Sequence, residues 1–366
     1  MIDKRQEPLK FGVVGLGNIA QAVHLPCIWF LESAELVSVC DIYESVARKV
    51  AKKYNVRSFV DCEEMLEKTD LDAIAICGPT ATHTPLSIMA LKKGINVLCE
   101  HPIACSVSQA RTLVEAEAQS SARVMIAYMM RYGSDVRVVE ELMLKGTIGD
   151  PYASCLTWFW SEHFPSYEKS VHARERAAMP ESFIRPEKDE KPALDPFANP
   201  PDALPPVYMY SFGSHLVNLL RGLCGEVDDA LSAFADLQEL RFDGWTKVSG
   251  RQSSATIRHE NGCISTIVIS DGPRSSIDLL LQIQCTKGAV EISSEGLPYP
   301  RRNRKKTVRV HTEAGHMYPY LAPTYEYVEE HKHFISCLNT NSPFKTDSID
   351  GMRTLEAIEK ILKVAR

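Results

Sequence analysis

The chain has 366 residues, of which 45% are hydrophobic and 24% charged, and its formal net charge is −6. This length predicts two domains, because a single hydrophobic core seldom keeps growing beyond about 250–300 residues. The acidic net charge argues against a nucleic-acid partner. No apolar run approaches the roughly 18 residues of a membrane span, which argues against a membrane partner. The polar residues near Met1 favour a cytoplasmic location.

The first third of the chain alternates short apolar runs with amphipathic stretches. This alternation predicts a parallel, doubly wound α/β sheet. The expected strands are 11–14, 35–40, 71–77, 95–99 and 123–128, and the expected helices lie near 18–31, 44–53, 84–93, 106–119 and 134–145.

A glycine-rich loop follows the first expected strand. Gly15 permits a tight turn, Gly17 lets the backbone approach a pyrophosphate, and Asn18 and Ile19 open a helix whose amides face that anion. Asp41 ends the second expected strand, where a carboxylate accepts hydrogen bonds from an adenosine ribose and disfavours a 2′-phosphate. The pattern therefore predicts a Rossmann domain that binds NAD in preference to NADP.

Further candidates follow the later strands, because ligands of parallel sheets gather at the carboxyl ends of the strands. Pro102 keeps His101 out of a helix and gives its imidazole a defined direction, although a solvent-facing loop histidine is the alternative. His83 is a second candidate, or else the cap of a helix near Pro85. The expected cofactor residues here are Pro79, His83, Glu100 and Arg131, and the expected substrate residues are His101, Arg131 and Tyr132.

The second part of the chain has longer strand-like runs punctuated by turns such as Asn261-Gly262. We expect an α+β domain with an antiparallel sheet, one face of which is available to a neighbouring subunit. Eleven cysteines are scattered without a C-x-x-C pair, and we interpret them as buried hydrophobes and expect no metal site. The expected strands are 152–162, 229–238, 252–260, 262–270, 277–286 and 289–294, followed by two helices between 324 and 366.

These patterns set the expected domain limits. Residues 1–130 form the Rossmann domain and residues 131–366 the substrate and oligomerisation domain, although the helix near 350–366 has the option of packing back on the first domain. Nine prolines between 164 and 207 predict an extended insertion. A lid over substrate, an arm around another subunit and a solvated loop are three interpretations of that insertion.

A polar stripe crosses an otherwise apolar segment near residue 215. Ser211, His215 and Asn218 are spaced by four and three residues, so a helix would place them on one face, with Tyr210 beside them. Buried polar groups need partners, which substrate hydroxyls or other protein groups would supply. Trp160 with Trp158 offers either a platform for a sugar ring or ordinary sheet packing.

Together these motifs resemble the glucose-fructose oxidoreductase / inositol dehydrogenase / MocA (Gfo/Idh/MocA) family over essentially the whole chain. The resemblance implies a Rossmann domain followed by an open-faced antiparallel sheet, homo-oligomers formed through that sheet, and NAD(P)-linked oxidation or reduction of sugars, glycosides or cyclitols. The matching segments are 15–20, 79–83, 100–102, 131–132, 148–149, 213–215 with Asn218, 286–288 and 350–351.

Two positions depart from the family pattern. His101 stands where the family usually has a lysine, and Ser211 stands where an acid usually precedes the histidine by four residues, whereas His215 is retained. We assign His215 as the general base, His101 as the partner that orients the hydroxyl, and Ser211, Asn218 and Tyr210 as hydrogen-bonding support. One alternative is an enzyme that recycles bound NAD through a transient keto-sugar, and another is a non-catalytic NAD-binding sensor or scaffold.

Overall fold

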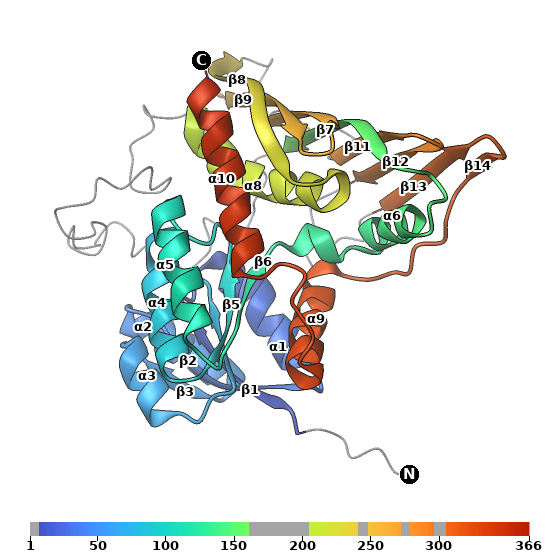
Figure 1. Ribbon diagram of the computed structural model, residues 1–366. Helices are drawn as coiled ribbons and strands as arrows, with labels where there is room; N and C mark the ends of the chain where they lie inside the picture. The colour runs from blue at the N-terminus through green and yellow to red at the C-terminus, as the bar shows by residue number, and fades with distance from the viewer. Residues whose placement is uncertain (1–6, 161–204, 241–247, 272–278, 296–304, 366) are drawn as a thin grey trace, which may run out of the picture. The chain divides into compact units, whose positions relative to one another are not determined.

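The computed structural model describes residues 7–160, 205–240, 248–271, 279–295 and 305–365. The chain forms two compact units (Figure 1). The described part of the first unit consists of the segment that ends at Tyr128 together with the later segment Tyr327–Met352. The sequence instead assigned 131–366 to one domain. The insertion expected at 164–207 lies outside the described residues, except for its last three residues, which begin a helix.

The first unit is built on a parallel sheet with the strand order β3-β2-β1-β4-β5-β6. The order reverses between β1 and β4, which is the doubly wound arrangement that the sequence predicted. β3 is the one strand of this sheet that the sequence analysis did not anticipate. The strands are β1 (Leu9–Val14), β2 (Ala34–Cys40), β3 (Arg57–Phe59), β4 (Ala73–Ile76), β5 (Asn96–Glu100) and β6 (Val124–Ala127).

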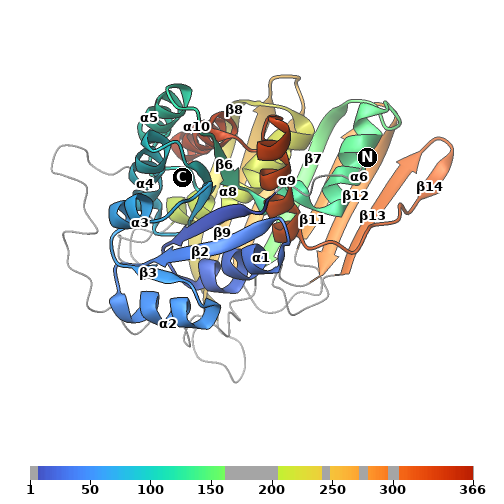
Figure 2. The ribbon, with the colours of Figure 1, turned by 90° about the horizontal axis from the view of Figure 1, so that it is seen from below.

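Helices cover both faces of this sheet, with α4 and α5 on one side and α1 and α9 on the other (Figures 1 and 2). Local capping explains where several of them start: Ser106 accepts a hydrogen bond from the Gln109 amide at 3.2 Å, and Asp61 accepts one from the Glu64 amide at 2.8 Å. The helices are η1 (Ala20–His24), α1 (Leu25–Phe30), α2 (Glu44–Tyr54), α3 (Cys62–Lys68), α4 (Thr80–Lys92), α5 (Val107–Ala118) and α9 (Glu326–Thr340).

The segment after α9 extends the edge of the first sheet. The Ile126 amide donates to the Thr346 carbonyl at 2.7 Å, and Asp347 forms a bridge with Met125 before α10 (Ser348–Val364) begins. The two expected C-terminal helices are therefore confirmed. The first of them packs on the Rossmann sheet, where the rings of Phe334 and Phe11 lie 5.9 Å apart.

The second unit contains a larger sheet with the strand order β14-β13-β12-β11-β7-β10-β9-β8. Most neighbours are antiparallel, as expected, but β7 and β10 run parallel, so the sheet is mixed. The Asn261-Gly262 hairpin between β9 and β10 is confirmed, with Gly262 at φ +85°. The strands are β7 (Pro151–Trp160), β8 (Val227–Leu240), β9 (Val248–His259), β10 (Ile264–Asp271), β11 (Leu279–Cys285), β12 (Gly288–Glu295), β13 (Lys305–Thr312) and β14 (Gly315–Met317).

The long helix α8 (Pro205–Cys224) covers one face of this second sheet. Among its described side chains, Leu216, Val217 and Leu220 are fully buried, and an added Cβ at Gly213 would lie 3.4 Å from Ile269 of β10. The second unit also contains η2 (Met129–Tyr132) and α6 (Ser134–Leu144). Among the described residues, no helix is both long and apolar enough to cross a bilayer.

Candidate functional site

The glycine loop between β1 and η1 is shaped by contact with the loop after β4. Gly15 has φ +80°, and a Cβ there would lie 2.4 Å from the backbone nitrogen of Gly78, so the close approach of the two loops requires glycine. A Cβ at Gly17 would meet no described atom within 4 Å. The backbone at Gly17 therefore borders open space, and Asn18 and Ile19 begin the helix next to it, as the sequence predicted.

Asp41 at the end of β2 is buried and holds the same loop. Its Oδ2 accepts a hydrogen bond from the Leu16 amide at 2.8 Å, and its Oδ1 accepts one from the Tyr43 amide at 3.0 Å. The carboxylate thus fixes the glycine loop directly, a role that the sequence analysis did not assign. The Asp41 carboxylate has further lone pairs that are able to accept another hydrogen bond. The predicted hydrogen bond from ribose to Asp41 stays a prediction.

His83 on α4 is enclosed by backbone carbonyls. Its Nδ1 lies 2.7 Å from the Pro102 oxygen and its Nε2 lies 2.9 Å from the Gly78 oxygen. Burial lowers the pKa of this imidazole, and that effect exceeds the opposing effect of the two carbonyls. The ring links the loops after β4 and β5, and the expected contact with a cofactor at His83 and Pro79 stays a prediction.

Glu100 ends β5 and meets two histidines. Its Oε1 lies 2.7 Å from His24 Nε2, and its Oε2 accepts a hydrogen bond from the His101 amide at 3.0 Å. His101 is partly exposed, it precedes Pro102 through a cis peptide bond, and its ring lies 5.7 Å from that of Tyr128. The strand end therefore holds an imidazole in a defined place, as the X-Pro sequence predicted.

Only some of the polar residues expected on one face of α8 have described side chains. His215 is 7% exposed, and burial lowers the pKa of its imidazole to about 3. Asn218 is fully buried and makes contacts within the second unit, with Oδ1 3.4 Å from Arg131 Nη1 and Nδ2 2.9 Å from Thr354 Oγ1. Other protein groups thus supply the hydrogen-bond partners of Asn218, which is one of the two alternatives that the sequence left open. The side chains of Ser211, Tyr210 and Trp160 lie outside the described residues.

Arg131 packs against α8. Its Nη1 lies 3.3 Å from the Asn218 carbonyl, and a Cβ at Gly222 would lie 2.2 Å from its Cζ, so Gly222 makes room for the guanidinium. Tyr132 is buried, and Trp158 is buried with its ring edge-on to Phe212 at 6.0 Å. Trp158 thus packs in the core of the second unit, which was the ordinary alternative to a sugar platform.

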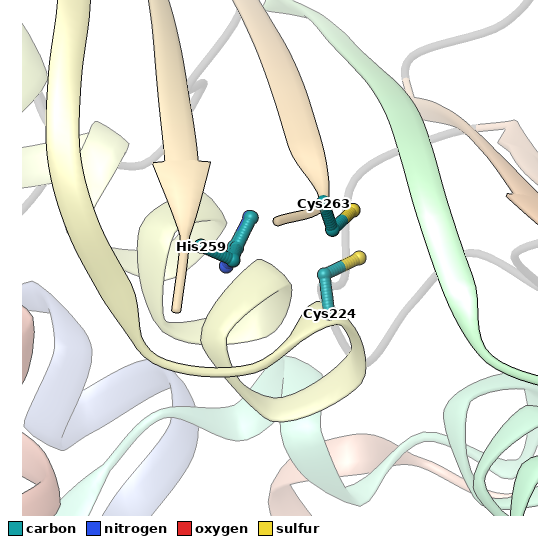
Figure 3. Close-up of side chains that lie close together, drawn as sticks. All are labelled: Cys224, His259 and Cys263. Carbon is teal, nitrogen blue, oxygen red and sulfur yellow. The ribbon is translucent and has the colours of Figure 1, made fainter. Parts of the chain in front are cut away.

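A cluster that the sequence did not suggest lies at the end of α8. Cys224, His259 and Cys263 are buried, and one ligand-type atom of each lies within 4.8 Å of the others (Figure 3). The thiols are hydrogen-bonded to each other and to Ser265, while His259 Nε2 lies 2.7 Å from Ser265 Oγ and Nδ1 lies 2.6 Å from the Gly225 oxygen. The hydrogen bond to Cys263 and burial raise the pKa of the Cys224 thiol. The members of the cluster thus have hydrogen-bond partners within the second unit.

The glycine loop fits a dinucleotide. The open space at Gly17, the tight turn at Gly15 and the adjoining helix start are the features of a loop that suits a pyrophosphate. The buried Asp41 stands beside this loop. Each of these features belongs to the first unit.

Comparison with known proteins agrees with this arrangement. The family model described as "Oxidoreductase family, NAD-binding Rossmann fold" matches residues 9–128. The chain is 30% identical over 148 residues to the D-glucoside 3-dehydrogenase of Escherichia coli (strain K12), an alignment that covers 40% of this chain and 42% of that protein. The alignment with this relative thus spans less than half of the relative's length.

Two comparisons extend over nearly the whole chain. The D-apiose dehydrogenase of Paraburkholderia graminis is 22% identical over 367 residues, covering 98% of this chain and 88% of that protein. The crystal structure of the WlbA dehydrogenase from Bordetella pertussis in complex with NADH and UDP-GlcNAcA superposes with a TM-score of 0.73 at 18% identity, covering 98% and 96% of the two chains. This structural likeness shows a shared fold. Residues 9–128 therefore resemble the NAD-binding Rossmann domain of that oxidoreductase family.

Proposed function

We propose that this protein is an NAD-dependent oxidoreductase that oxidises or reduces a secondary alcohol of a sugar, glycoside or cyclitol by hydride transfer. The observation that carries the proposal is the glycine loop, in which Gly15 is required for the turn and Gly17 leaves open space beside a helix start. Relatives named for glucoside and apiose dehydrogenation support the substrate class. When bound, NAD supplies the hydride acceptor.

The protein's own residues then have distinct tasks. The loop amides near Gly17 hold the pyrophosphate, and Asp41 fixes that loop and binds the ribose. His215 accepts the hydroxyl proton, because its low pKa leaves it unprotonated at neutral pH. His101 orients the hydroxyl, with Ser211 and Tyr210 in support.

The convergence of His101 and His215 beside the cofactor is part of this proposal. The proposal also includes assembly of identical subunits through the second sheet, and a cytoplasmic location. The sheet face opposite α8 exposes Phe159 (41%) and Ile264 (44%), which favours association through that face. Light scattering on the purified protein measures the subunit number.

Calorimetric titration with NAD and NADP, followed by absorbance at 340 nm with a panel of polyols and glycosides, tests the function. We expect tighter binding of NAD, and turnover with at least one substrate. His215→Asn should lower kcat by about 10²–10⁴ without weakening NAD binding, while His316→Asn on the exposed strand β14 serves as the matched control. NAD binding without turnover would favour the sensor, and glycoside cleavage without net NADH would favour cofactor recycling.

A further inference from the structure

A chain of three buried side chains, one acid and two imidazoles, links α9, η1 and β5 in the first unit. It ends at Glu100, next to His101. His331 of α9 places Nε2 3.2 Å from Nδ1 of His24, and Nε2 of His24 lies 2.7 Å from Glu100 Oε1. At the far end, His331 Nδ1 lies 2.7 Å from the backbone oxygen of Tyr327. His24 and His331 are fully buried and Glu100 is 7% exposed, so water does not substitute for these contacts.

The backbone carbonyl at the end of this chain fixes where the protons are. A carbonyl only accepts, so His331 donates from Nδ1, and its neutral ring offers the lone pair of Nε2 to His24. His24 therefore donates from Nδ1, and its other nitrogen meets the carboxylate of Glu100. If Glu100 is ionised, His24 must donate from both nitrogens and is an imidazolium. Burial and the charge of His24 lower the pKa of His331 to about 3 against the opposing effect of the Tyr327 carbonyl, which keeps that ring neutral.

The groups around Glu100 favour its ionised form. Burial acts to raise the pKa of the carboxyl, but the hydrogen bond and charge of His24, followed by the charge of His101, leave the pKa below its ordinary value. The nearby Glu330 is fully buried, and burial together with the charge of Glu100 raises its pKa well above the usual range, so it adds no second negative charge. The titratable groups that face Glu100 are His24 from η1, Cys77 after β4, His83 from α4, Cys99 and His101 on its own strand and loop, and Glu330 from α9.

Glu100 in turn controls His101. The Nε2 atom of His101 lies 3.8 Å from Glu100 Oε2, and the same oxygen holds the His101 backbone amide. A carboxylate at this distance stabilises the imidazolium form of a histidine and restrains its ring. The arrangement is that of an acid orienting a histidine. The acid is itself held by the imidazole of His24, which contacts His331 in turn.

We propose that His24 and His331 are positioning residues that keep Glu100 ionised and directed at His101, so that His101 retains positive charge beside the reacting hydroxyl. This proposal rests on the proposed oxidoreductase function and deepens it, because it accounts for how a histidine stands in for the lysine that the family usually has at this position. The competing account is a purely structural link between η1, β5 and α9.

The proton placement is measured directly, without turnover, by nitrogen NMR of histidine-labelled full-length protein at pH 7. We expect His331 to be neutral with its proton on Nδ1, and His24 to carry protons on both nitrogens. Assignment comes from His331→Gln and His24→Asn. A His24 ring with a single proton would overturn the proposal, because Glu100 would then hold the proton and offer His101 no charge.

The effect on His101 is measured from the pH profile of kcat/KM. Glu100→Gln and His24→Asn should move the alkaline limb to lower pH by roughly one to three units, because the imidazolium of His101 loses its carboxylate partner and deprotonates more readily. His333→Gln is the matched control, since His333 lies on α9 and contacts Lys345 and Cys337. Unmoved limbs in both variants, with NAD affinity intact, would overturn the proposal. If wild-type protein binds NAD but turns over no substrate, the proposed function fails and the NMR result alone decides the proton placement.

Discussion

The fully buried carboxyl of Glu330 makes a quantitative prediction about stability. Neither of its oxygens has a hydrogen-bond partner among the described residues, and burial with the charge of Glu100 holds its pKa well above the usual range. The folded protein therefore keeps a proton that the unfolded chain releases above about pH 4.3. Stability is lost as pH rises from there towards the pKa of the folded state, at about 1.4 kcal/mol per pH unit.

Glu330→Gln removes this titration while keeping the side-chain size. The difference in unfolding free energy between the variant and the wild type should grow in favour of the variant by about 2.7 kcal/mol from pH 5 to pH 7, if the pKa in the folded state exceeds 7. Urea unfolding followed by circular dichroism at pH 5, 6 and 7 measures this difference. Glu329→Gln, which removes an acid paired with Lys332 at 3.0 Å on the same helix, is the control. A difference that stays constant with pH would refute the reasoning.

Three further predictions follow from particular contacts. Gly15→Ala should weaken NAD binding and also lower the melting temperature, because the backbone φ at this position is +80°. Gly17→Ala should weaken NAD binding alone, because the added Cβ meets no described atom. Calorimetry measures the binding and thermal unfolding measures the melting temperature. Gly222→Ala should destabilise the protein by about 1–3 kcal/mol because the new Cβ overlaps Arg131, and urea unfolding tests this. Since burial lowers the pKa of His215 to about 3, wild-type stability should fall as pH drops from 6.5 towards 3, and His215→Asn should shift acid unfolding to lower pH. Equal acid midpoints for the two proteins would contradict that account.

Local sequence determined the first unit well because its signals are local. Gly15, Gly17 and Asp41 occupy the positions that a dinucleotide turn requires, and the alternation of apolar runs and helices is a property of neighbouring residues. The same holds for the Asn261-Gly262 hairpin, whose turn is specified by two residues. The short β3 and α3 escaped prediction because three and seven residues carry too little periodicity.

Pairings between distant segments were decided only by the tertiary structure. The parallel contact of β7 with β10 joins residues more than one hundred positions apart, and no local pattern encodes strand direction. The return of α9 to the Rossmann sheet brings His331 to His24, and the end of α8 meets the β9–β10 hairpin at Cys224 and Cys263.

The sequence by itself therefore determined the cofactor loop, the class of fold and the candidate histidines. Only the tertiary structure decided which polar side chains already have protein partners, such as Asn218 between Arg131 and Thr354, and which form a buried hydrogen-bonded chain, such as Glu100 with His24. The physical reason is that backbone conformation follows from neighbours in sequence, whereas burial, hydrogen-bond partners and proton positions depend on residues that only folding brings together.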